Sequence, residues 1–243
     1  MVYGIIAAGE GSRLKADGYH GFKPMVNIAG EALIQRLIRI FQTNDASAIY
    51  IILNKAQKEV GRFIEGLPNK PGTPIKILYK DTPSSFHSFY ALLDIIAPED
   101  RQQVCISTID PVFREDIFKG YIEAFIRDRE LDGLMAVTSF VEDDKPLHVY
   151  TDSQLRITKF ASQPLQGQPW ISGGIYLLRN KALQVAEPAM QAGVSKMRNY
   201  QQAVLDAGLY LKAYDLGRII DIDHTSDIPL AEALLSAVPL THR

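Results

Sequence analysis

The first half of the chain alternates short runs of apolar, β-branched residues with stretches in which apolar residues recur at helical spacing. The runs predict strands and the intervening stretches predict amphipathic helices. The expected strands are Val2–Ala7, Ile49–Leu53, Ile75–Tyr79 and Val104–Ser107. A repeated strand–helix order is typical of a parallel sheet with helices on both faces. Right-handed crossovers place the carboxyl ends of such strands along one edge, where ligands usually bind.

The second half has a different pattern, with short strands separated by short turns. Strands are expected at Leu134–Ser139, His148–Thr151, Leu155–Phe160 and Gly174–Leu178, and then near Tyr210–Tyr214 and Arg218–Ile222. Helices are expected near Met197–Leu205 and over Ser226–Ala237. Such closely spaced strands indicate a mixed or antiparallel extension of the parallel sheet. We predict one domain over residues 1–243, with one half at about 1–112 and a second at about 113–243.

Composition excludes several classes of function. The 243 residues carry a net charge of −2, so no basic footprint for nucleic acid is present. The one cysteine, Cys105, lies in an apolar run and predicts a buried side chain, because no second cysteine is available for a disulfide. No apolar stretch reaches the roughly 20 residues that span a membrane, and the first residues lack the basic region of a signal peptide. We expect a cytoplasmic protein without membrane or nucleic-acid partners.

A glycine-containing loop follows the first expected strand. Gly9 and Gly11 lack Cβ atoms, so their backbone can approach a ligand closely, and their N–H groups can cradle phosphate oxygens. Arg13 offers a planar fork of donors for a phosphate. Lys23 follows ten residues later in the same region and is a second cation that can stabilise charge on a phosphate.

Three simpler interpretations of this loop compete. A dinucleotide-binding fingerprint requires glycine at position 14, where the chain has Leu14. A phosphate-binding P-loop requires lysine and then serine or threonine after its last glycine, but Glu10 follows Gly9. The third interpretation is a plain glycine turn beside a surface arginine.

The run Ala7–Leu14, followed by Lys23-Pro24, resembles the opening of the nucleotidyltransferase superfamily typified by nucleotide-sugar pyrophosphorylases. That family has a strand, then Ala-Ala-Gly-x-Gly-Ser/Thr-Arg-Leu, then Lys-Pro. The resemblance implies an α/β fold, Rossmann-like with three α/β/α layers, a mostly parallel central sheet and a mixed or antiparallel extension in the C-terminal half. The implied nucleotide-binding residues of the loop are Ala7, Ala8, Gly9, Gly11, Ser12 and Arg13. The insert Lys15–Phe22 departs from the family pattern and predicts a lid over the triphosphate.

A second nucleotide contact is expected after the third strand, where the family carries a glycine-rich turn that approaches the base. Here Ser84 and Ser85 stand in place of the usual glycine and alanine. Contact with base or ribose is one predicted role for the two serines. Capping of the following helix by the Ser84 hydroxyl is another, and the two roles are compatible.

Carboxylates for a metal are expected from two distant places. Asp110 lies just after the fourth strand, where the family places an aspartate that binds Mg²⁺, although Ile109 replaces the usual preceding glycine. Asp221 and Asp223 resemble two variants of the family's closing signature, and either can supply the second ligand. Because they alternate along an expected strand, both side chains should point to one face. Asp227 is expected in the first turn of the last helix.

The acceptor half resembles the family in one motif and departs from it in another. Gly173-Gly174-Ile175-Tyr176 resembles a strand whose glycines let a sugar ring approach the backbone, so Gly173, Gly174, Tyr176 and Trp170 are predicted to line the acceptor site. The family's Glu-Lys-Pro motif, which holds sugar hydroxyls and phosphate, is replaced by Phe160–Pro164 without either charge. Lys159, Lys196 or Arg198 can supply the phosphate contact instead.

The resemblance implies a Mg²⁺-dependent nucleotidyltransferase. It would join a nucleoside monophosphate from a nucleoside triphosphate to a phosphorylated small molecule, with a sugar 1-phosphate favoured, and release pyrophosphate. Arg13, Lys23 and Asp110 are the predicted catalytic residues, and Asp110, Asp221 and Asp223 the predicted metal ligands. The alternative is a nucleotide or sugar-phosphate sensor on the same fold with little catalysis.

Overall fold

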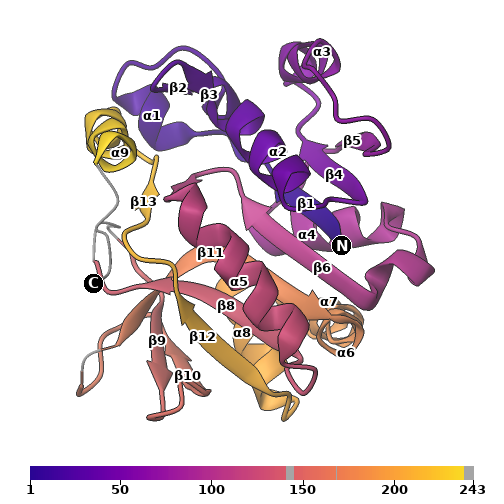
Figure 1. Ribbon diagram of the computed structural model, residues 1–243, viewed down its shortest axis with the longest axis vertical. Helices are drawn as coiled ribbons and strands as arrows, with labels where there is room; N and C mark the ends of the chain where they lie inside the picture. Colours follow the sequence, from indigo (N-terminus) through magenta and orange to yellow (C-terminus); the bar gives the residue numbers. More distant parts are fainter. Residues whose placement is uncertain (141–144, 168, 238–243) are drawn as a thin grey trace.

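The computed structural model describes residues 1–140, 145–167 and 169–237. Within these residues a nine-stranded sheet crosses the molecule (Figure 1). Its parallel part contains β1 (Val2–Ile6), β4 (Ala48–Leu53), β5 (Ile75–Tyr79) and β6 (Gln103–Thr108). The prediction of a parallel sheet in the first half is therefore confirmed, and each strand lies within two residues of its expected bounds.

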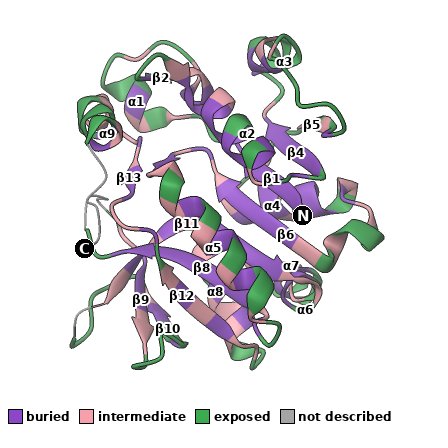
Figure 2. Cartoon of the chain, in the orientation of Figure 1, coloured by how far each residue is buried: buried purple, intermediate pink, exposed green. Residues whose placement is uncertain are grey.

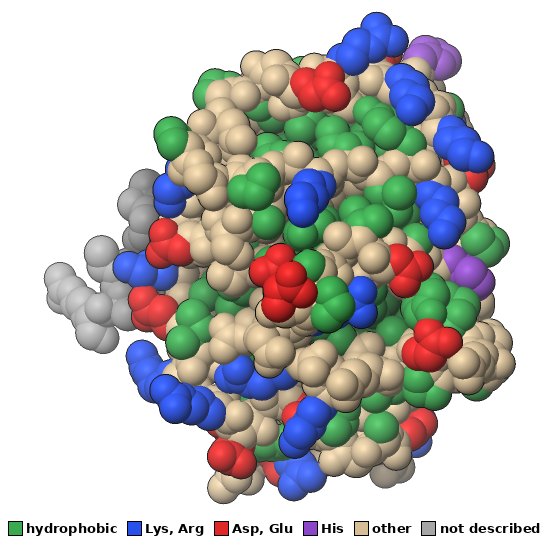
Figure 3. Space-filling view, turned by 90° about the vertical axis from the view of Figure 1, so that its right-hand side faces the viewer, with side chains coloured by type: hydrophobic (Ala, Val, Ile, Leu, Met, Phe, Trp, Pro, Cys, Tyr) green, Lys and Arg blue, Asp and Glu red, His purple; other side chains and the backbone are tan. Residues whose placement is uncertain are grey.

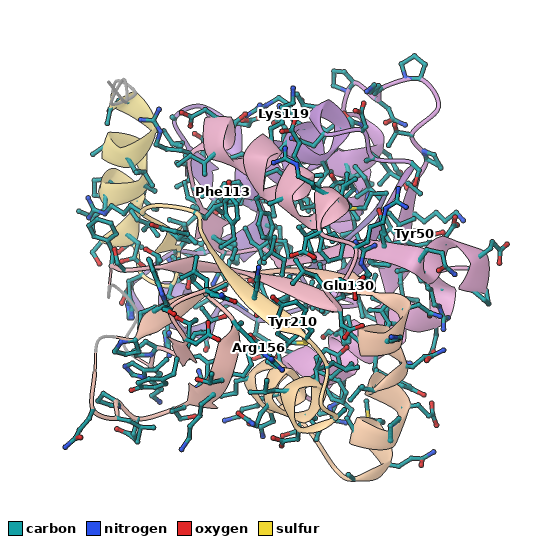
Figure 4. All side chains as sticks on the ribbon, turned by 60° about the horizontal axis from the view of Figure 1, so that its bottom comes forward. Tyr50, Phe113, Lys119, Glu130, Arg156 and Tyr210 are labelled. Carbon is teal, nitrogen blue, oxygen red and sulfur yellow. The ribbon has the colours of Figure 1, made fainter. Side chains whose placement is uncertain are left out.

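The second half extends the same sheet in a mixed manner, as predicted. The added strands are β8 (Gly133–Thr138), β9 (His148–Thr151), β10 (Ile157–Ala161), β11 (Trp170–Arg179) and β12 (Leu211–Asp215). β11 joins the two parts, because it pairs antiparallel with β8 on one edge and with β6 and β9 on the other. β12 then pairs parallel with β8. In this extension the guanidinium carbon of Arg156 lies 5.2 Å from the centre of the Tyr210 ring. The two side chains are labelled next to one another in Figure 4.

Helices cover both faces of the sheet. One face is covered by α2 (Leu33–Thr43), α3 (Lys58–Glu65), α5 (Glu115–Arg127) and α9 (Asp227–Ser236). The other is covered by α4 (Ser85–Ile95), α6 (Asn180–Gln184), α7 (Ala186–Gln191) and α8 (Met197–Asp206). This is the predicted three-layer α/β/α arrangement. No helix of the described residues is long and apolar enough to cross a lipid bilayer.

Short elements complete the chain and lie mostly in the loops. They are α1 (Ser12–Ala16), η1 (Lys23–Met25), β2 (Asn27–Ile28), β3 (Glu31–Ala32), η2 (Pro98–Gln102), β7 (Pro111–Val112) and β13 (Ile220–Asp221). Two of them, β7 and β13, pair with each other in a separate antiparallel ribbon. None of these short elements except β13 was expected, because two to five residues are too few to establish a period.

The alternation of side chains along each central strand divides the core into two layers. The central strands β1 and β4 are coloured as buried in Figure 2. In β1, Tyr3 and Ile5 pack under α2, whereas Val2 and Ile6 pack under α4. All four are buried, which explains why the strand reads as a continuous apolar run. Cys105 is buried in the layer of Tyr3, as expected.

Strand order places the functional edge of the sheet. β4 and β5 lie on one side of β1, and β6 lies on the other. At such a reversal the loops after neighbouring parallel strands separate and leave a crevice at the carboxyl ends. The loop after β1 carries Gly9 and Gly11. Asp110 lies two residues after the end of β6.

A cluster of charges fixes the segment after β7 to α2. Arg36 is buried, donates to the carbonyl of Phe113 at 3.0 Å and pairs with Glu115 at 2.8 Å. Arg39 makes paired hydrogen bonds with both Glu115 and Glu31 at 2.7–2.8 Å. Hydrogen bonds from Arg39, together with the charges of both arginines, hold the pKa of Glu115 below its usual value despite its partial burial.

Glu115→Gln is expected to lower the free energy of unfolding by about 1–2 kcal/mol at pH 7. This is less than the roughly 3–5 kcal/mol for breaking a fully buried pair, because the Glu115 side chain is 37% exposed. A lowered carboxyl pKa contributes stability at neutral pH that is lost as pH falls through the folded-state value. Urea unfolding at pH 7 and near pH 3.5 should show the two proteins converging in acid. An equal difference at both pH values would contradict this assignment.

Candidate active site

Two cavities open at the carboxyl ends of β1 and β6. The first has a volume of about 540 Å³ and is lined by the glycine loop, the start of α4 and the end of β6. The second has a volume of about 580 Å³ and lies between the start of α4, β11 and the start of α8. The two cavities have in common Arg13, Ser84, Ser85, Thr108, Asp110 and Asp223, which we call the shared wall. A ligand in one cavity therefore meets a ligand in the other at these six residues.

The glycine loop presents unused N–H groups to the first cavity. Residues 8–13 all line it, whereas Ala7 is buried and donates its N–H to Ile52 at 3.0 Å. Within the described part of the chain, the N–H groups of residues 8–11 donate no hydrogen bond to protein. Gly11 has a φ of 62° and directly precedes α1, so it turns the backbone from the loop into the helix. A ring of free donors beside two cations is suited to an anion such as phosphate.

The two loop glycines should respond differently to alanine. A Cβ on Gly11 would lie 3.3 Å from that of Lys23 and would occupy a left-handed conformation, whereas a Cβ on Gly9 meets nothing within 4 Å. Gly11→Ala is therefore expected to lower the free energy of unfolding by about 1–2 kcal/mol. Gly9→Ala should lower the free energy of unfolding by less than about 0.5 kcal/mol. Any loss of nucleotide affinity in this variant would then show that the nucleotide lies close to the backbone of residue 9. Equal stability of the two variants in urea would contradict the difference in backbone conformation.

Four charged side chains form one cluster, three of them on the shared wall and the fourth, Lys23, in the first cavity. The Lys23 ammonium lies 3.0 Å from the Asp110 carboxylate and 2.7 Å from that of Asp223. Arg13 donates to the other oxygen of Asp223 at 2.5 Å. Residues 200 positions apart are thus brought into one cluster. The structure unites the predicted catalytic residues Arg13, Lys23 and Asp110 with one of the two alternative late aspartates.

Lys23 and Asp110 favour each other's charged form. Burial acts to raise the pKa of Asp110, but the ammonium of Lys23 and hydrogen bonds from Thr108 and Lys23 outweigh it and lower the pKa below its usual value. Burial likewise acts to lower the pKa of Lys23, and the carboxylates of Asp110 and Asp223 raise it above its usual value. At neutral pH Asp110 is therefore an ionised carboxylate beside a charged Lys23.

The ribbon of β7 and β13 brings the distant aspartates to Asp110. Asp221 pairs with Pro111, and the N–H of Ile222 donates to the carbonyl of Asp110 at 3.1 Å. Asp221 lines only the second cavity, whereas Asp223 belongs to the shared wall.

The expectation that Asp221 and Asp223 alternate along one strand was wrong. β13 ends at Asp221, and the N–H of Asp223 turns back to the carbonyl of Asp221 at 3.0 Å. Asp227 stabilises this turn, since one of its carboxylate oxygens accepts from the N–H groups of Asp223 and His224 at 2.9 and 2.6 Å. Asp227 is also the first residue of α9, as predicted.

The two serines before α4 contact the opposite half of the chain. Ser84 stands at the N-cap of α4 but makes no side-chain capping bond, so the predicted capping by its hydroxyl is wrong. Its hydroxyl donates instead to the carbonyl of Ser195 and lies 2.8 Å from Nδ1 of His87. Ser85 accepts from the N–H of Met197, the first residue of α8, at 3.2 Å. These contacts fix the start of α8 beside the shared wall, and both serines still line the two cavities.

The second cavity contains some, but not all, of the predicted acceptor residues. Gly174 and Tyr176 line it. Gly174 has a φ of +72°, and a Cβ there would lie 2.6 Å from the Thr108 hydroxyl, so only glycine allows this close approach of β11 to β6. Gly173 faces away, toward Ile219 and a small separate hollow, and Trp170 packs against the core and lines neither cavity.

Among the described residues, four basic side chains line the second cavity, namely Arg13 of the shared wall and three others. Lys196 and Arg198 are two of the three candidates for the phosphate contact, and Lys145 joins them. Arg198 also donates to the carbonyl of Lys145 at 2.9 Å, which holds the two segments together. Lys159 is exposed on β10 and lines neither cavity. Lys145 was missed because the charged stretch of sequence around it has no period or motif.

Basic and acidic side chains are interspersed with neutral ones on the face of the molecule shown in Figure 3. Among the described residues, no group of three or more histidine, cysteine, aspartate or glutamate side chains is arranged to hold a metal by itself. A divalent ion at the shared wall would therefore need ligands from a bound substrate as well as from the protein.

Solved structures share this fold. A Bacillus anthracis protein assigned as a glucose-1-phosphate thymidylyltransferase, solved with a sucrose, superposes with a TM-score of 0.82 at 19% identity, over 100% of this chain and 98% of its own. The inositol-1-phosphate CTP transferase from T. maritima gives 0.77 at 16% identity, over 96% and 94%. A nucleoside-diphosphate-sugar pyrophosphorylase from Vibrio cholerae gives 0.67 at 16% identity, over 95% and 99%. At these identities the likeness concerns the fold.

Sequence comparison identifies the family. Curated proteins provide no match to the chain. Residues 4–178 match the MobA-like NTP transferase domain, which covers well over half of the chain and includes the glycine loop, Lys23 and Asp110. The chain therefore belongs to the MobA-like NTP transferase family and is a nucleotidyltransferase.

Proposed function

We propose that the protein transfers a nucleoside monophosphate from a nucleoside triphosphate to a phosphorylated small molecule, with a sugar 1-phosphate as the first candidate, and releases pyrophosphate. The observation that carries this proposal is the shared wall, where two cavities meet at Asp110, Asp223 and Arg13. One cavity offers free loop N–H groups for a triphosphate, and the other offers lysine and arginine side chains for an acceptor phosphate. Two folds of the same type are described as transferases for glucose 1-phosphate and inositol 1-phosphate, which supports the choice of acceptor.

The reaction needs no nucleophile from the protein. An oxygen of the acceptor phosphate attacks the α-phosphorus of the triphosphate, and the bond from that phosphorus to the oxygen bridging to the β-phosphate breaks. The electron pair leaves with pyrophosphate. The protein contributes by holding the two phosphates in line and by neutralising the charge that develops. Lys23 and Arg13 line the first cavity and are the cations for the α-phosphate and the leaving pyrophosphate, respectively.

The residues of the shared wall fit Mg²⁺. Magnesium takes one or two protein carboxylates together with substrate phosphates and water, and Asp110 and Asp223 offer these oxygens, with Asp221 beside them. Lys23 pairs with both carboxylates and Arg13 with Asp223, so positive charge lies beside the oxygens that would bind the ion. When bound there, the ion would neutralise charge on the reacting phosphates.

The test is pyrophosphate release from each common nucleoside triphosphate with glucose 1-phosphate, inositol 1-phosphate and a set of phosphorylated alcohols, with Mg²⁺ or with a chelator. Release that requires one triphosphate, one acceptor and the metal is the expected result. Triphosphate binding by thermal shift without release from any acceptor would instead favour a sensor on the same fold. Release that persists with the chelator would contradict the metal assignment.

A further inference from the structure

Gln201 on α8 is a buried amide with an unsatisfied atom. Its side chain is 2% exposed, and its Oε1 lies out of contact with solvent and accepts no hydrogen bond within the described residues. A buried amide group without a partner costs roughly 1–3 kcal/mol, so such groups are rare in native proteins unless a ligand or water satisfies them. Gln201 lines the second cavity, so a ligand in that cavity is a candidate hydrogen-bond partner for the amide.

The neighbouring glutamine on the same helix shows what a structural amide looks like here. Gln202 accepts from the N–H of Phe160 at 3.1 Å and donates to Asp206 at 2.7 Å. It lines neither cavity. The two residues are chemically identical and adjacent in sequence, so the lack of a partner at Gln201 is a property of its position beside the cavity.

The other groups around Gln201 favour an anionic ligand. Lys145, Lys196 and Arg198 line the same cavity. α8 begins at Met197, so its N-terminus adds a favourable potential for negative charge. Gln201 comes four residues after Met197, on the same face of the helix and about 6 Å along its axis. The acidic residues that line the cavity within the described part of the chain are Asp110, Asp221 and Asp223, which the proposed function assigns to the metal.

We infer that Gln201 is an acceptor-recognising residue, whose amide hydrogen-bonds a hydroxyl of a phosphorylated polyol held by its phosphate at the start of α8. This inference rests on the proposed transferase function. A hydroxyl can donate to the amide oxygen or accept from the amide nitrogen, so it satisfies Gln201 in either orientation of the side chain. A quaternary ammonium acceptor is unsuited to this cavity, since four cations and one aromatic side chain, Tyr176, line it among the described residues.

The test compares Gln201→Met with Gln202→Met, both of which keep the length of the side chain. For Gln201→Met we expect the KM for inositol 1-phosphate and glucose 1-phosphate to rise about tenfold or more, with unchanged KM for the triphosphate. Its melting temperature should stay the same or rise, because an unsatisfied buried amide is removed. Gln202→Met should melt earlier and keep the wild-type KM. If Gln201 had a merely structural role, Gln201→Met would melt earlier than the wild type and keep the wild-type KM for both acceptors.

A second readout separates this inference from the proposed reaction. Calorimetric binding of inositol 1-phosphate and glucose 1-phosphate is measured on wild type and Gln201→Met with triphosphate present and metal chelated. Weaker binding to Gln201→Met supports the inference even without turnover. Equal affinity for both proteins, or no binding of either polyol phosphate to the wild type, overturns it. If ethanolamine phosphate were the one acceptor that gave pyrophosphate release, the proposed reaction would stand and the role of Gln201 would be overturned.

Discussion

Asp110→Ala is expected to lower turnover by about a thousandfold or more while the protein stays folded. Asp110 lies on the shared wall, where it is the one carboxylate supplied by the end of the parallel sheet. Removing a group that stabilises developing charge typically lowers kcat by roughly 10²–10³, and loss of a metal ligand adds to this. Turnover is measured as pyrophosphate release with saturating substrates, and triphosphate binding by thermal shift confirms that the first cavity is intact.

The matched control is Asp116→Ala. Asp116 lies in the first turn of α5, pairs with Arg114 at 2.8 Å and is 54% exposed, so its loss should leave turnover near the wild-type value. Asp110→Asn keeps the shape of the side chain and removes its charge, and it should be as defective as alanine. Near-normal activity of either Asp110 variant with Mg²⁺ present would show that the metal is bound elsewhere.

Lys23→Met should lower turnover by roughly 10²–10³ and should also change how the protein responds to Mg²⁺. The side chain is 8% exposed and lies between two carboxylates, so its loss leaves Asp110 and Asp223 without their common counter-ion. Like charges held close together destabilise the fold, and a divalent ion relieves this repulsion. We therefore expect Mg²⁺ alone to raise the melting temperature of Lys23→Met more than that of the wild type.

Lys119→Met is the control for this second prediction, because Lys119 lies on α5 with its side chain 77% exposed. It should match the wild type in turnover and in its response to Mg²⁺. If Mg²⁺ stabilised Lys23→Met no more than the wild type, the two carboxylates would not be the site that the metal uses. Wild-type turnover in Lys23→Met would remove this lysine from the proposed mechanism.

The parallel half of the sheet was predictable because β1 and β4 are buried on both faces and because α2 and α3 each have a strong apolar face. The site was predictable only where a motif is local, as in the loop from Ala8 to Arg13. The course of the chain around Asp221 and Asp223 was not, because it depends on the Asp227 carboxylate binding two backbone N–H groups. Side-chain bonds to the backbone compete with strand pairing and leave no period in the sequence.

Other features depend on contacts between distant segments. The contacts of Ser84 and Ser85 with residues 195 and 197 cross more than a hundred positions, and a serine before a helix reads the same with or without them. The same limit applies to Gln201 and Gln202, which differ only in what surrounds them. α6 and α7 were not expected, since they are five and six residues long and α7 contains Pro188.

The ribbon of β7 and β13 has a consequence for the order in which the protein becomes competent. During synthesis the N-terminal segments emerge and fold first. The glycine loop, Lys23 and Asp110 are then available long before residue 223 leaves the ribosome. Until β13 pairs with β7, Lys23 has a single carboxylate partner and the wall between the cavities is incomplete. A nascent chain can thus hold most of the proposed triphosphate site while the transfer reaction waits for the last twenty or so described residues.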